Sequence, residues 1–282
     1  MTEVLRYAAF TTDPDAGNPA GVVLDASGLA DGEMQRIAAD VGYSETAFLS
    51  PLDTPGTFRV RYFSPQAEVP FCGHATIASA VAVADRAGAG DLVFETNAGR
   101  VPVATALDAT GRPTATLTSV EPAVAPVADA DLAEALAALG WEPGDLDPGF
   151  PPRVAYAGAH HLVLAAATRQ RLAALAYDFD RLRDLMMRRD WTTVALVWRS
   201  SETEFDVRNP FPVGGVVEDP ATGAAAAAFG GYLRTLQIIR TPATLRLHQG
   251  ADLGRPGLLV VDVPAGSGGV RVTGNAVAIP SE

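Results

Sequence analysis

The chain repeats one sequence pattern in its two halves. The first copy reads Arg-Tyr-Phe-Ser-Pro at 61–65, then Cys-Gly-His-Ala-Thr at 72–76 and an alanine-rich apolar run. The second copy reads Arg-Asn-Pro-Phe-Pro at 208–212, then Asp-Pro-Ala-Thr-Gly at 219–223 and another alanine-rich run. The Arg, Pro and Cys/Asp positions share one spacing of 147 residues. A repeat this long is typical of a duplicated domain rather than a solenoid, so we expect two similar domains.

The length and apolar content of the chain are sufficient for two separate cores. The chain has 282 residues, of which 48% are hydrophobic, enough for two domains of about 140 residues each. We therefore predict one domain over residues 1–120 and a second over 121–282. The C-terminal strand near 270–282 is expected to pack back on the first domain.

Composition excludes several classes of function. The net charge of −12 argues against nucleic acid and anionic membranes as partners. No apolar span of membrane length and no signal-like start are present, so we expect a soluble cytoplasmic protein. All 21 basic residues are arginine, which excludes a pyridoxal-phosphate Schiff base, a lysine aldolase and a lysine-bearing P-loop. The single cysteine excludes internal disulfides and cysteine-rich metal sites.

The two alanine-rich runs, 76–84 and 224–233, are apolar on every side and therefore predict helices buried on every side. Strands are expected at 4–10, 20–24, 46–49, 58–63, 92–95, 100–105, 114–120, 161–166, 193–198, 205–208, 244–247, 258–263, 270–273 and 276–279. Helices are expected at 31–40 and at 169–189 with a break near Asp178, and 121–147 reads as a connection with a short helix. The predicted fold is α+β, with a β-barrel-like sheet wrapped around a central helix in each domain. Without repeated βαβ units, a Rossmann fold is not expected.

The segment Asp219–Gly223 supports two interpretations. Asp followed by Pro is typical of a helix N-cap, which would be purely structural. The start of a buried helix also carries partial positive charge, and glycine lets a ligand approach the backbone, so the same segment could bind a carboxylate. Cys72-Gly73-His74 stands at the mirrored position. Two such helix starts facing each other across a domain cleft would favour an anionic ligand.

Glu45 begins an apolar strand in the segment Tyr43–Leu49. It could be an ordinary carboxylate at a strand edge. In an apolar cleft, however, loss of hydration would raise its pKa, as a general acid/base near neutral pH requires. The matched position of the second copy holds Thr192, so the two copies differ where chemistry is expected.

Two further segments have polar residues in turns. Asn18 begins a turn that enters a strand, which turn chemistry alone could explain. Its counterpart in the second half contains His160 and His161. A His-His pair invites a metal interpretation, but no third ligand lies at a useful spacing, so we predict no metal site.

Together these motifs resemble the phenazine-biosynthesis PhzF-like family of the diaminopimelate epimerase-like superfamily. The matching segments are Asp15-Ala-Gly-Asn18-Pro-Ala-Gly-Val, Ser44-Glu45-Thr-Ala-Phe, Phe71-Cys-Gly-His74-Ala-Thr and Gly215-Val-Val-Glu-Asp219-Pro-Ala-Thr-Gly223. They occur in the family's order and span nearly the whole chain. The resemblance implies two pseudo-symmetric domains, in agreement with the duplicated buried helix.

The resemblance implies a cofactor-free isomerase that acts on a small carboxylate-bearing, cyclic substrate by proton transfer. The family's type reaction converts trans-2,3-dihydro-3-hydroxyanthranilate to its keto isomer. By analogy Glu45 would shuttle the proton, while His74 and Asp219 would bind and polarise the substrate. The implied substrate-binding residues are Asn18, Ser44, Cys72, Gly73, Thr222, Gly223 and Ala224. A homodimer is also implied.

Two departures from the family pattern leave alternatives open. Ala224 stands where many members have serine, which removes one polar contact and is compatible with a non-catalytic protein that binds small anions. Amino-acid epimerases of the superfamily have two catalytic cysteines. By the resemblance, Cys72 occupies the position of one of them and Asp219 the position of the other. A single thiol excludes a two-thiol epimerase. It leaves open a racemase or epimerase with Cys72 on one face of the substrate and Glu45 or Asp219 on the other.

Overall fold

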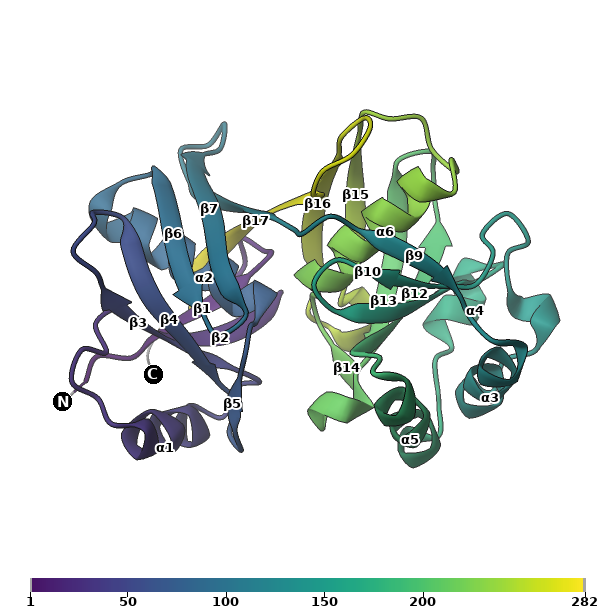
Figure 1. The fold of residues 1–282 in the computed structure, drawn as a ribbon, viewed down its shortest axis with the longest axis horizontal. Coiled ribbons are helices and arrows are strands. Elements are labelled where there is room, and N and C mark those ends of the chain that lie inside the picture. Colours follow the sequence, from purple (N-terminus) through teal and green to yellow (C-terminus); the bar gives the residue numbers. More distant parts are fainter. Residues whose placement is uncertain (1, 281–282) are drawn as a thin grey trace. The chain divides into compact units, whose positions relative to one another are not determined.

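The computed structural model describes residues 2–280 and divides the chain into two compact units (Figure 1). The first unit contains the chain up to Thr118 and the C-terminal segment from Thr273 onward. The second unit contains Ser119–Val272. The last described segment of the chain therefore belongs to the same unit as the first.

The first unit is a closed ring of strands. Its strands are β1 (Leu5–Ala9), β2 (Asn18–Val23), β3 (Thr46–Pro51), β4 (Thr57–Phe63), β5 (Glu68–Val69), β6 (Asp91–Thr96), β7 (Gly99–Leu107), β8 (Pro113–Thr118) and β17 (Arg271–Ala278). Neighbouring strands pair in the order β1-β2-β3-β4-β6-β7-β8-β17, and β17 pairs again with β1. The β2–β3 and β4–β6 pairs are parallel, since a helix lies in each connection.

The second unit repeats this strand order. Its strands are β9 (Ala123–Pro126), β10 (Arg153–Tyr156), β11 (His160–Ala165), β12 (Thr193–Arg199), β13 (Glu204–Pro210), β14 (Glu218–Asp219), β15 (Ala243–Gln249) and β16 (Gly257–Val263). They pair in the order β9-β10-β11-β12-β13-β15-β16, with parallel pairs at β11–β12 and β13–β15. This is the succession of β17-β1-β2-β3-β4-β6-β7 in the first unit. The duplication in the sequence is therefore a duplication of topology.

One buried helix packs against the strands of each unit, α2 (Gly73–Ala87) in the first and α6 (Gly223–Thr235) in the second. Every residue of α2 from His74 to Ala84 is buried. Small residues let β16 approach α6 closely, because a Cβ atom on Gly230 would lie 3.1 Å from both Val261 and Val263. The predicted α+β fold, with a barrel-like sheet around a central helix, is confirmed.

The remaining helices lie outside the sheets. They are α1 (Asp31–Val41), α3 (Asp129–Leu139), α4 (Arg169–Ala173) and α5 (Phe179–Arg189), with single 3-10 turns at Pro143–Asp145, Pro212–Gly214 and Ala251–Leu253. The predicted break near Asp178 is confirmed, because the Asp178 side chain caps α5 by accepting from the Arg181 N–H at 3.0 Å. Over the part of the chain that the structure describes, no helix is both long and apolar enough to span a membrane.

Three extra residues in the second copy shift the register of the repeat. The loop between β4 and β5 spans 64–67, whereas the loop between β13 and β14 spans 211–217. Helix α2 therefore begins at Gly73 with Cys72 as N-cap, and α6 begins 150 residues later at Gly223 with Thr222 as N-cap. The assignment of Asp219 as the counterpart of Cys72, and as a helix cap, is wrong. The counterpart of Cys72 is Thr222, and Asp219 lies in β14.

A repeated ion pair confirms this register. In the first unit Arg61 donates from Nε and Nη2 to the two carboxylate oxygens of Glu68, at 2.8 and 2.7 Å. In the second unit Arg208 binds Glu218 in the same two-point manner, with Nε to Oε1 at 3.0 Å and Nη2 to Oε2 at 2.6 Å. The arginines are 147 residues apart and the glutamates 150, as the longer loop requires.

The structure corrects two other predictions. The strands expected at 270–273 and 276–279 form one continuous strand, β17. Gly274 lets this strand pass the Phe10 ring, since a Cβ atom there would lie 2.3 Å from Phe10 Cδ1. The connection expected at 121–147 contains a strand, β9, besides the helix, and β10 has no counterpart among the predicted strands.

Candidate functional site

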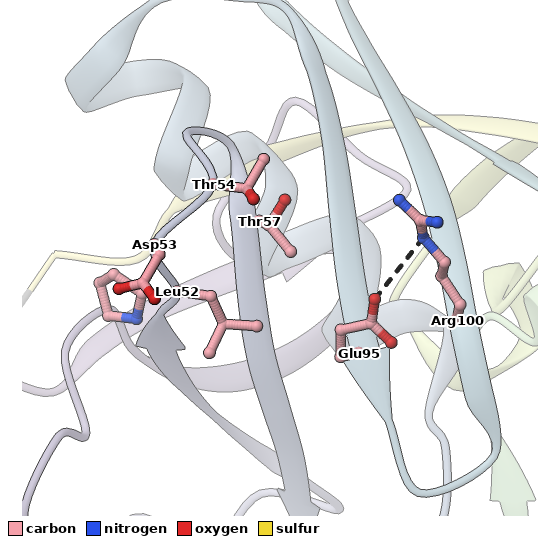
Figure 2. Close-up of a pocket in the computed structure, with 7 residues that line it drawn as sticks. Leu52, Asp53, Thr54, Thr57, Glu95 and Arg100 are labelled. Atoms are coloured by element: carbon pink, nitrogen blue, oxygen red, sulfur yellow. Dashed lines mark ion pairs between the residues drawn. The ribbon is translucent and has the colours of Figure 1, made fainter.

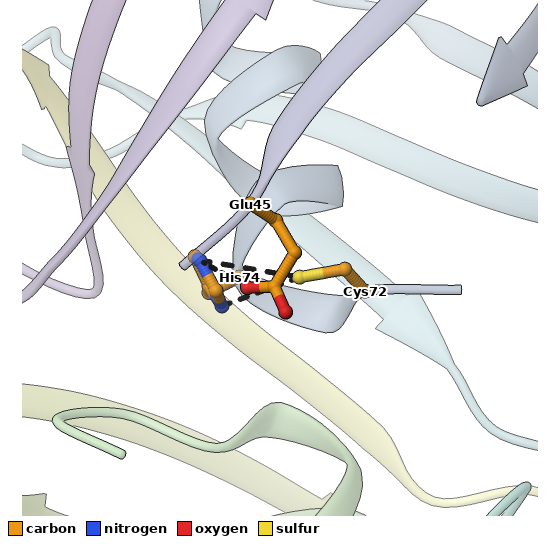
Figure 3. A group of neighbouring side chains, drawn as sticks. All are labelled: Glu45, Cys72 and His74. Carbon is orange, nitrogen blue, oxygen red and sulfur yellow. Dashed lines mark hydrogen bonds and ion pairs between the residues drawn. The ribbon is translucent and has the colours of Figure 1, made fainter. Parts of the chain in front are cut away.

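Glu45, Cys72 and His74 form one compact group in the first unit, which we call the Glu45 cluster (Figure 3). Glu45 immediately precedes β3, Cys72 is the N-cap of α2, and His74 is the second residue of that helix. His74 Nε2 lies 3.5 Å from Glu45 Oε2, and His74 Nδ1 lies 3.3 Å from Cys72 Sγ. The structure thus brings together three of the residues selected from the sequence.

A close approach of two strands fixes the backbone at Glu45. The Glu45 carbonyl accepts a hydrogen bond from the Gly21 N–H at 3.1 Å, and Gly21 pairs with Thr46 in the parallel β2–β3 ladder. A Cβ atom on Gly21 would lie 2.5 Å from Thr46 Oγ1. Glycine at position 21 is therefore needed for β2 to hold the residue that precedes β3.

We expect Gly21→Ala to cost about 1–3 kcal/mol of unfolding free energy, the usual cost of overpacking. It should also slow any reaction that depends on Glu45, because displacement of Thr46 moves this residue. Gly32→Ala in α1 is the matched control, since a Cβ atom at Gly32 meets nothing within 4 Å. Urea unfolding and steady-state kinetics check the pair of variants. Equal stability and activity in both would contradict this account of the β2–β3 approach.

Burial governs the electrostatics of the cluster. The side chains of Glu45 and His74 are 13% and 5% exposed. Burial raises the pKa of Glu45 above its usual value, and hydrogen bonds from Ser44 and Cys72 offset part of that increase. Ser44 Oγ also lies 3.4 Å from His74 Nε2. The carboxyl group can therefore hold or release a proton closer to neutral pH than an exposed glutamate can.

The arrangement limits how Cys72 and Glu45 could share a reaction. Racemisation by two bases needs one group on each face of the substrate carbon. The ligand atoms of Glu45, Cys72 and His74 all lie within 4.8 Å of one another, so Glu45 and Cys72 stand on one side. This geometry disfavours a mechanism in which Glu45 and Cys72 act on opposite faces of the substrate carbon. It suits proton removal and return on a single face.

The second unit has its own polar group at the start of α6, which we call the Asp219 group: Asp219, Thr222 and Gln249. Thr222 Oγ1 donates to Asp219 Oδ2 at 2.5 Å. Gln249 Nε2 donates to the Asp219 carbonyl at 2.7 Å and to Thr222 Oγ1 at 3.0 Å, and Gln249 Oε1 accepts from the Thr222 N–H at 3.1 Å. Gln249 was not among the residues predicted from the sequence. Its signal was weak, because it lies at the end of β15, far from every motif.

The other predicted binding residues lie at the same two helix starts or at a strand end. Gly73 is the first residue of α2, while Gly223 and the half-buried Ala224 are the first two residues of α6. Asn18 is buried and begins β2, paired with Ala9 of β1.

His160 and His161 do not act as a pair. His160 is half-buried and lies 3.4 Å from Asp190, whereas His161 is fully buried with Nδ1 2.8 Å from Thr193 Oγ1. Thr193 donates its proton to Asn209 Oδ1 at 3.0 Å, so it can only accept from His161 Nδ1–H. Burial lowers the pKa of His161 to about 3, so this side chain is neutral at physiological pH.

The buried His161 predicts acid sensitivity of the second unit. Its pKa is about 3 in the folded protein and 6.5 in a model peptide, so the unfolded chain binds more protons between these values. Stability is therefore full above pH 6.5 and falls as the pH decreases, by about 1.4 kcal/mol per pH unit. Between pH 6.5 and 4.5 we expect a loss of roughly 2–3 kcal/mol from this group.

Urea unfolding of wild type and His161→Asn at the two pH values checks this expectation. Asparagine keeps an N–H donor for Thr193 but does not titrate. The variant should be less stable at neutral pH, because the ring is lost, yet its stability should depend less on pH. An equal loss in both proteins would rule out His161 as the source.

A separate hollow of about 490 Å³ lies beside the strand ends of the first unit (Figure 2). It is lined by Pro51, Leu52, Asp53, Thr54, Thr57, Glu95 and Arg100. Glu95 and Arg100 form an exposed ion pair there, at 3.5 Å. None of the candidate residues lines this hollow.

Comparison with known proteins identifies relatives over the whole length of the chain. The model of the family described as phenazine biosynthesis-like protein matches residues 7–281. An uncharacterized isomerase of Deinococcus radiodurans is 37% identical, over 93% of this chain and 87% of its own. The trans-2,3-dihydro-3-hydroxyanthranilate isomerase of Pseudomonas aeruginosa is 30% identical, over 96% and 94%. The crystal structure of a Bacillus anthracis phenazine biosynthesis protein of the PhzF family superposes with a TM-score of 0.86, at 25% identity, covering 99% of this chain and 98% of that one.

Proposed function

Because the chain belongs to the phenazine biosynthesis-like, or PhzF-like, family of isomerases, we propose that it isomerises a small carboxylate-bearing cyclic substrate by cofactor-independent proton transfer. Glu45 is the proposed general acid/base. His74, in the same cluster, and Asp219, in the second unit, are proposed to bind and polarise the substrate. Asn18, Ser44, Cys72, Gly73, Thr222, Gly223 and Ala224 are proposed to contribute to binding.

The observation that carries this proposal is the environment of Glu45. The carboxyl group is nearly buried, its pKa is raised, and an imidazole nitrogen lies 3.5 Å away. A general acid/base works best when its pKa approaches the working pH, because it must accept and return the same proton. Of the candidate residues, Glu45 meets this requirement through its surroundings in the fold.

The start of helix α2 supports binding of a carboxylate. The N-terminus of a buried helix carries partial positive charge, which favours an anionic group there. Cys72 and His74 lie in this first turn, so a carboxylate held there would be near the proton-transfer groups. The P. aeruginosa relative is named for a carboxylate-bearing ring compound, trans-2,3-dihydro-3-hydroxyanthranilate, and we take that compound as the first test substrate.

The test is ¹H NMR in D₂O with purified protein and trans-2,3-dihydro-3-hydroxyanthranilate. Conversion to the keto isomer, with deuterium at the newly protonated carbon or with direct transfer of the original proton, supports the proposal. If this compound and a panel of related cyclic carboxylates show neither isomerisation nor deuterium exchange, the protein is not a proton-transfer isomerase of such substrates. Ligand binding without exchange would instead favour the non-catalytic anion-binding alternative.

A racemase or epimerase that uses Cys72 is the second candidate, and the contact of Cys72 Sγ with His74 Nδ1 at 3.3 Å favours it. A thiol beside an imidazole can be activated as a thiolate. This candidate predicts that Cys72→Ser and treatment with iodoacetamide abolish activity. With Glu45 as acid/base, Cys72→Ser should lower kcat less than about tenfold, because serine keeps a hydrogen-bond donor to Glu45. Steady-state kinetics of Cys72→Ser separate the two mechanisms.

A homodimer and a cytoplasmic location stay predictions from the sequence. Sedimentation equilibrium of the purified chain would test the first, and fractionation of the source cells would test the second.

A further inference from the structure

The side chains of the Glu45 cluster are a donor set that soft divalent cations prefer. Thiolate, imidazole and carboxylate are the three protein ligands of Zn²⁺, and three such ligands with a fourth position left to water are typical of open zinc sites. We infer that Glu45, Cys72 and His74 bind one Zn²⁺ ion, and that the bound ion inhibits the enzyme by occupying its acid/base. The metal binding is independent of the proposed function, but the inhibition rests on it.

The donor atoms of the three side chains lie close enough together to share one zinc ion. Bonds of about 2.3 Å to sulfur and 2.0–2.2 Å to nitrogen and oxygen place the sulfur about 3.6 Å from the nitrogen and the nitrogen about 3.4 Å from the oxygen. In the protein Cys72 Sγ lies 3.9 Å from His74 Nε2, and His74 Nε2 lies 3.5 Å from Glu45 Oε2. Cys72 Sγ also lies 3.3 Å from His74 Nδ1, so the imidazole has to turn before Nε2 faces the same ion as the sulfur. All three ligand atoms already lie within 4.8 Å of one another.

The three ligands are held by rigid elements. Cys72 and His74 are separated by one residue at the start of the buried helix α2. The backbone of Glu45 is anchored to β2 through the Gly21 N–H. Ligands that are already in position lose little conformational entropy when a cation binds. The fold therefore holds the backbone of all three ligands in place, so that a turn of the His74 ring is the main adjustment that a bound ion requires.

Charge balance also favours a divalent ion. Binding converts the Cys72 thiol to a thiolate and uses the ionised form of Glu45, so two negative charges face the two positive charges of Zn²⁺. The released protons pass to solvent, and no group is oxidised or reduced. An electroneutral set costs little to keep in a buried environment, whereas a monovalent cation would leave a net negative charge there.

Inhibition follows from the occupied donor atoms. A carboxylate oxygen bonded to Zn²⁺ cannot accept the substrate proton, and His74 cannot bind the substrate through the same nitrogen. Zn²⁺ and substrate should therefore compete. A chelator such as EDTA should restore the full rate, because no covalent bond to carbon forms or breaks.

Spectroscopic titration of the full-length protein with Co²⁺, a coloured substitute for Zn²⁺, tests the site without any substrate. A cobalt–thiolate charge-transfer band can arise only from Cys72, because it is the single cysteine of the chain. We expect the band to saturate at one Co²⁺ per chain and to vanish when Zn²⁺ displaces it. Cys72→Ala should abolish the band, while His160→Gln, at a half-buried histidine of the second unit beside Asp190, should leave it unchanged.

Calorimetry with Zn²⁺ gives the affinities of the same variants. Loss of a ligand should cost more than the roughly 10–100-fold expected for a residue behind the ligands, so Cys72→Ala and Glu45→Gln should each weaken binding by at least about 100-fold. Circular dichroism confirms that each variant is folded. The absence of a thiolate band with wild type, or Zn²⁺ affinity unchanged in both variants, would overturn the site. Zn²⁺ binding without inhibition would leave the site intact but contradict the role of Glu45 as acid/base.

Discussion

Replacement of Glu45 by glutamine is expected to lower kcat by roughly 10²–10⁴-fold, the usual contribution of a well-placed general acid/base. Glutamine has nearly the same shape as glutamate and keeps a carbonyl oxygen for the Ser44 and Cys72 donors, but it cannot carry the proton. KM should change little, because the substrate still meets His74 and the start of α2. The NMR assay in D₂O, run beside wild type, measures the loss.

The stability of this variant provides the control for folding. Burial raises the pKa of Glu45 in the folded protein above its unfolded value of 4.5. Any stability contributed by this group is therefore present below pH 4.5 and is lost as the pH rises through the folded pKa. Glu45→Gln removes that cost of ionisation, so the variant should be at least as stable as wild type at neutral pH. An inactive variant that is also unfolded would not count as evidence for catalysis.

A matched substitution separates chemistry from general charge. Glu33→Gln removes one negative charge at an exposed position in α1 and should leave kcat within about twofold of wild type. If Glu45→Gln retained the wild-type rate, Glu45 could not be the acid/base. The proton would then have to be carried by another group of the cluster, with Cys72 and His74 as the next residues to replace.

Much of the fold could be predicted because it depends on local patterns. An alanine-rich run without a polar face must be buried, and this placed α2 and α6 correctly. Alternation of apolar and polar residues located β4, and the aspartate before α5 marked the helix break at Asp178. The C-terminal strand was expected to pack on the first domain, but local patterns could not show that β17 would pair with β1 and β8.

The candidate site was predicted only in part, because the alignment of the two sequence copies depends on the length of one loop. The sequence alignment of the two copies held through Arg208 but failed after it, since three residues inserted between β13 and β14 do not disturb either strand. The error assigned Asp219 to the helix cap in place of Thr222. Gln249 could not be found, because its role depends on the contact of the end of β15 with the Asp219–Thr222 turn. The burial that raises the Glu45 pKa likewise exists only in three dimensions.

The duplicated arginine–glutamate pair allows an internal comparison of buried and accessible ion pairs. The Arg208 and Glu218 side chains are 9% and 1% exposed, whereas those of Arg61 and Glu68 are 22% and 28% exposed. Glu218→Ala leaves a buried guanidinium without its main partner, and we expect a loss of about 3–5 kcal/mol in unfolding free energy. Glu68→Ala should cost about 1 kcal/mol or less, because Arg61 retains water and Asp31 at 2.6 Å.

The tryptophans allow the two effects to be assigned to separate units. All three tryptophans, Trp141, Trp191 and Trp198, belong to the second unit. Selective excitation of tryptophan during urea unfolding therefore follows the second unit, while circular dichroism follows both. Glu218→Ala should shift the fluorescence transition to lower urea, and Glu68→Ala should affect the dichroism more than the fluorescence. Equal losses in the two variants would contradict the dependence on burial.

Removal of both partners distinguishes the value of the buried pair from the cost of breaking it. An uncompensated charge accounts for most of the loss in Glu218→Ala, so Arg208→Met combined with Glu218→Leu should recover most of the stability. Arg208 also donates to the backbone carbonyl of Ala173 at 2.9 Å, and that carbonyl would lose its bond in the double variant. A small residual deficit is therefore expected, of about 1–3 kcal/mol. A double variant no more stable than Glu218→Ala would contradict this account. It would show that the Arg208–Glu218 ion pair itself stabilises the contact of β13 with β14, and that the loss does not come from an unpaired Arg208 charge.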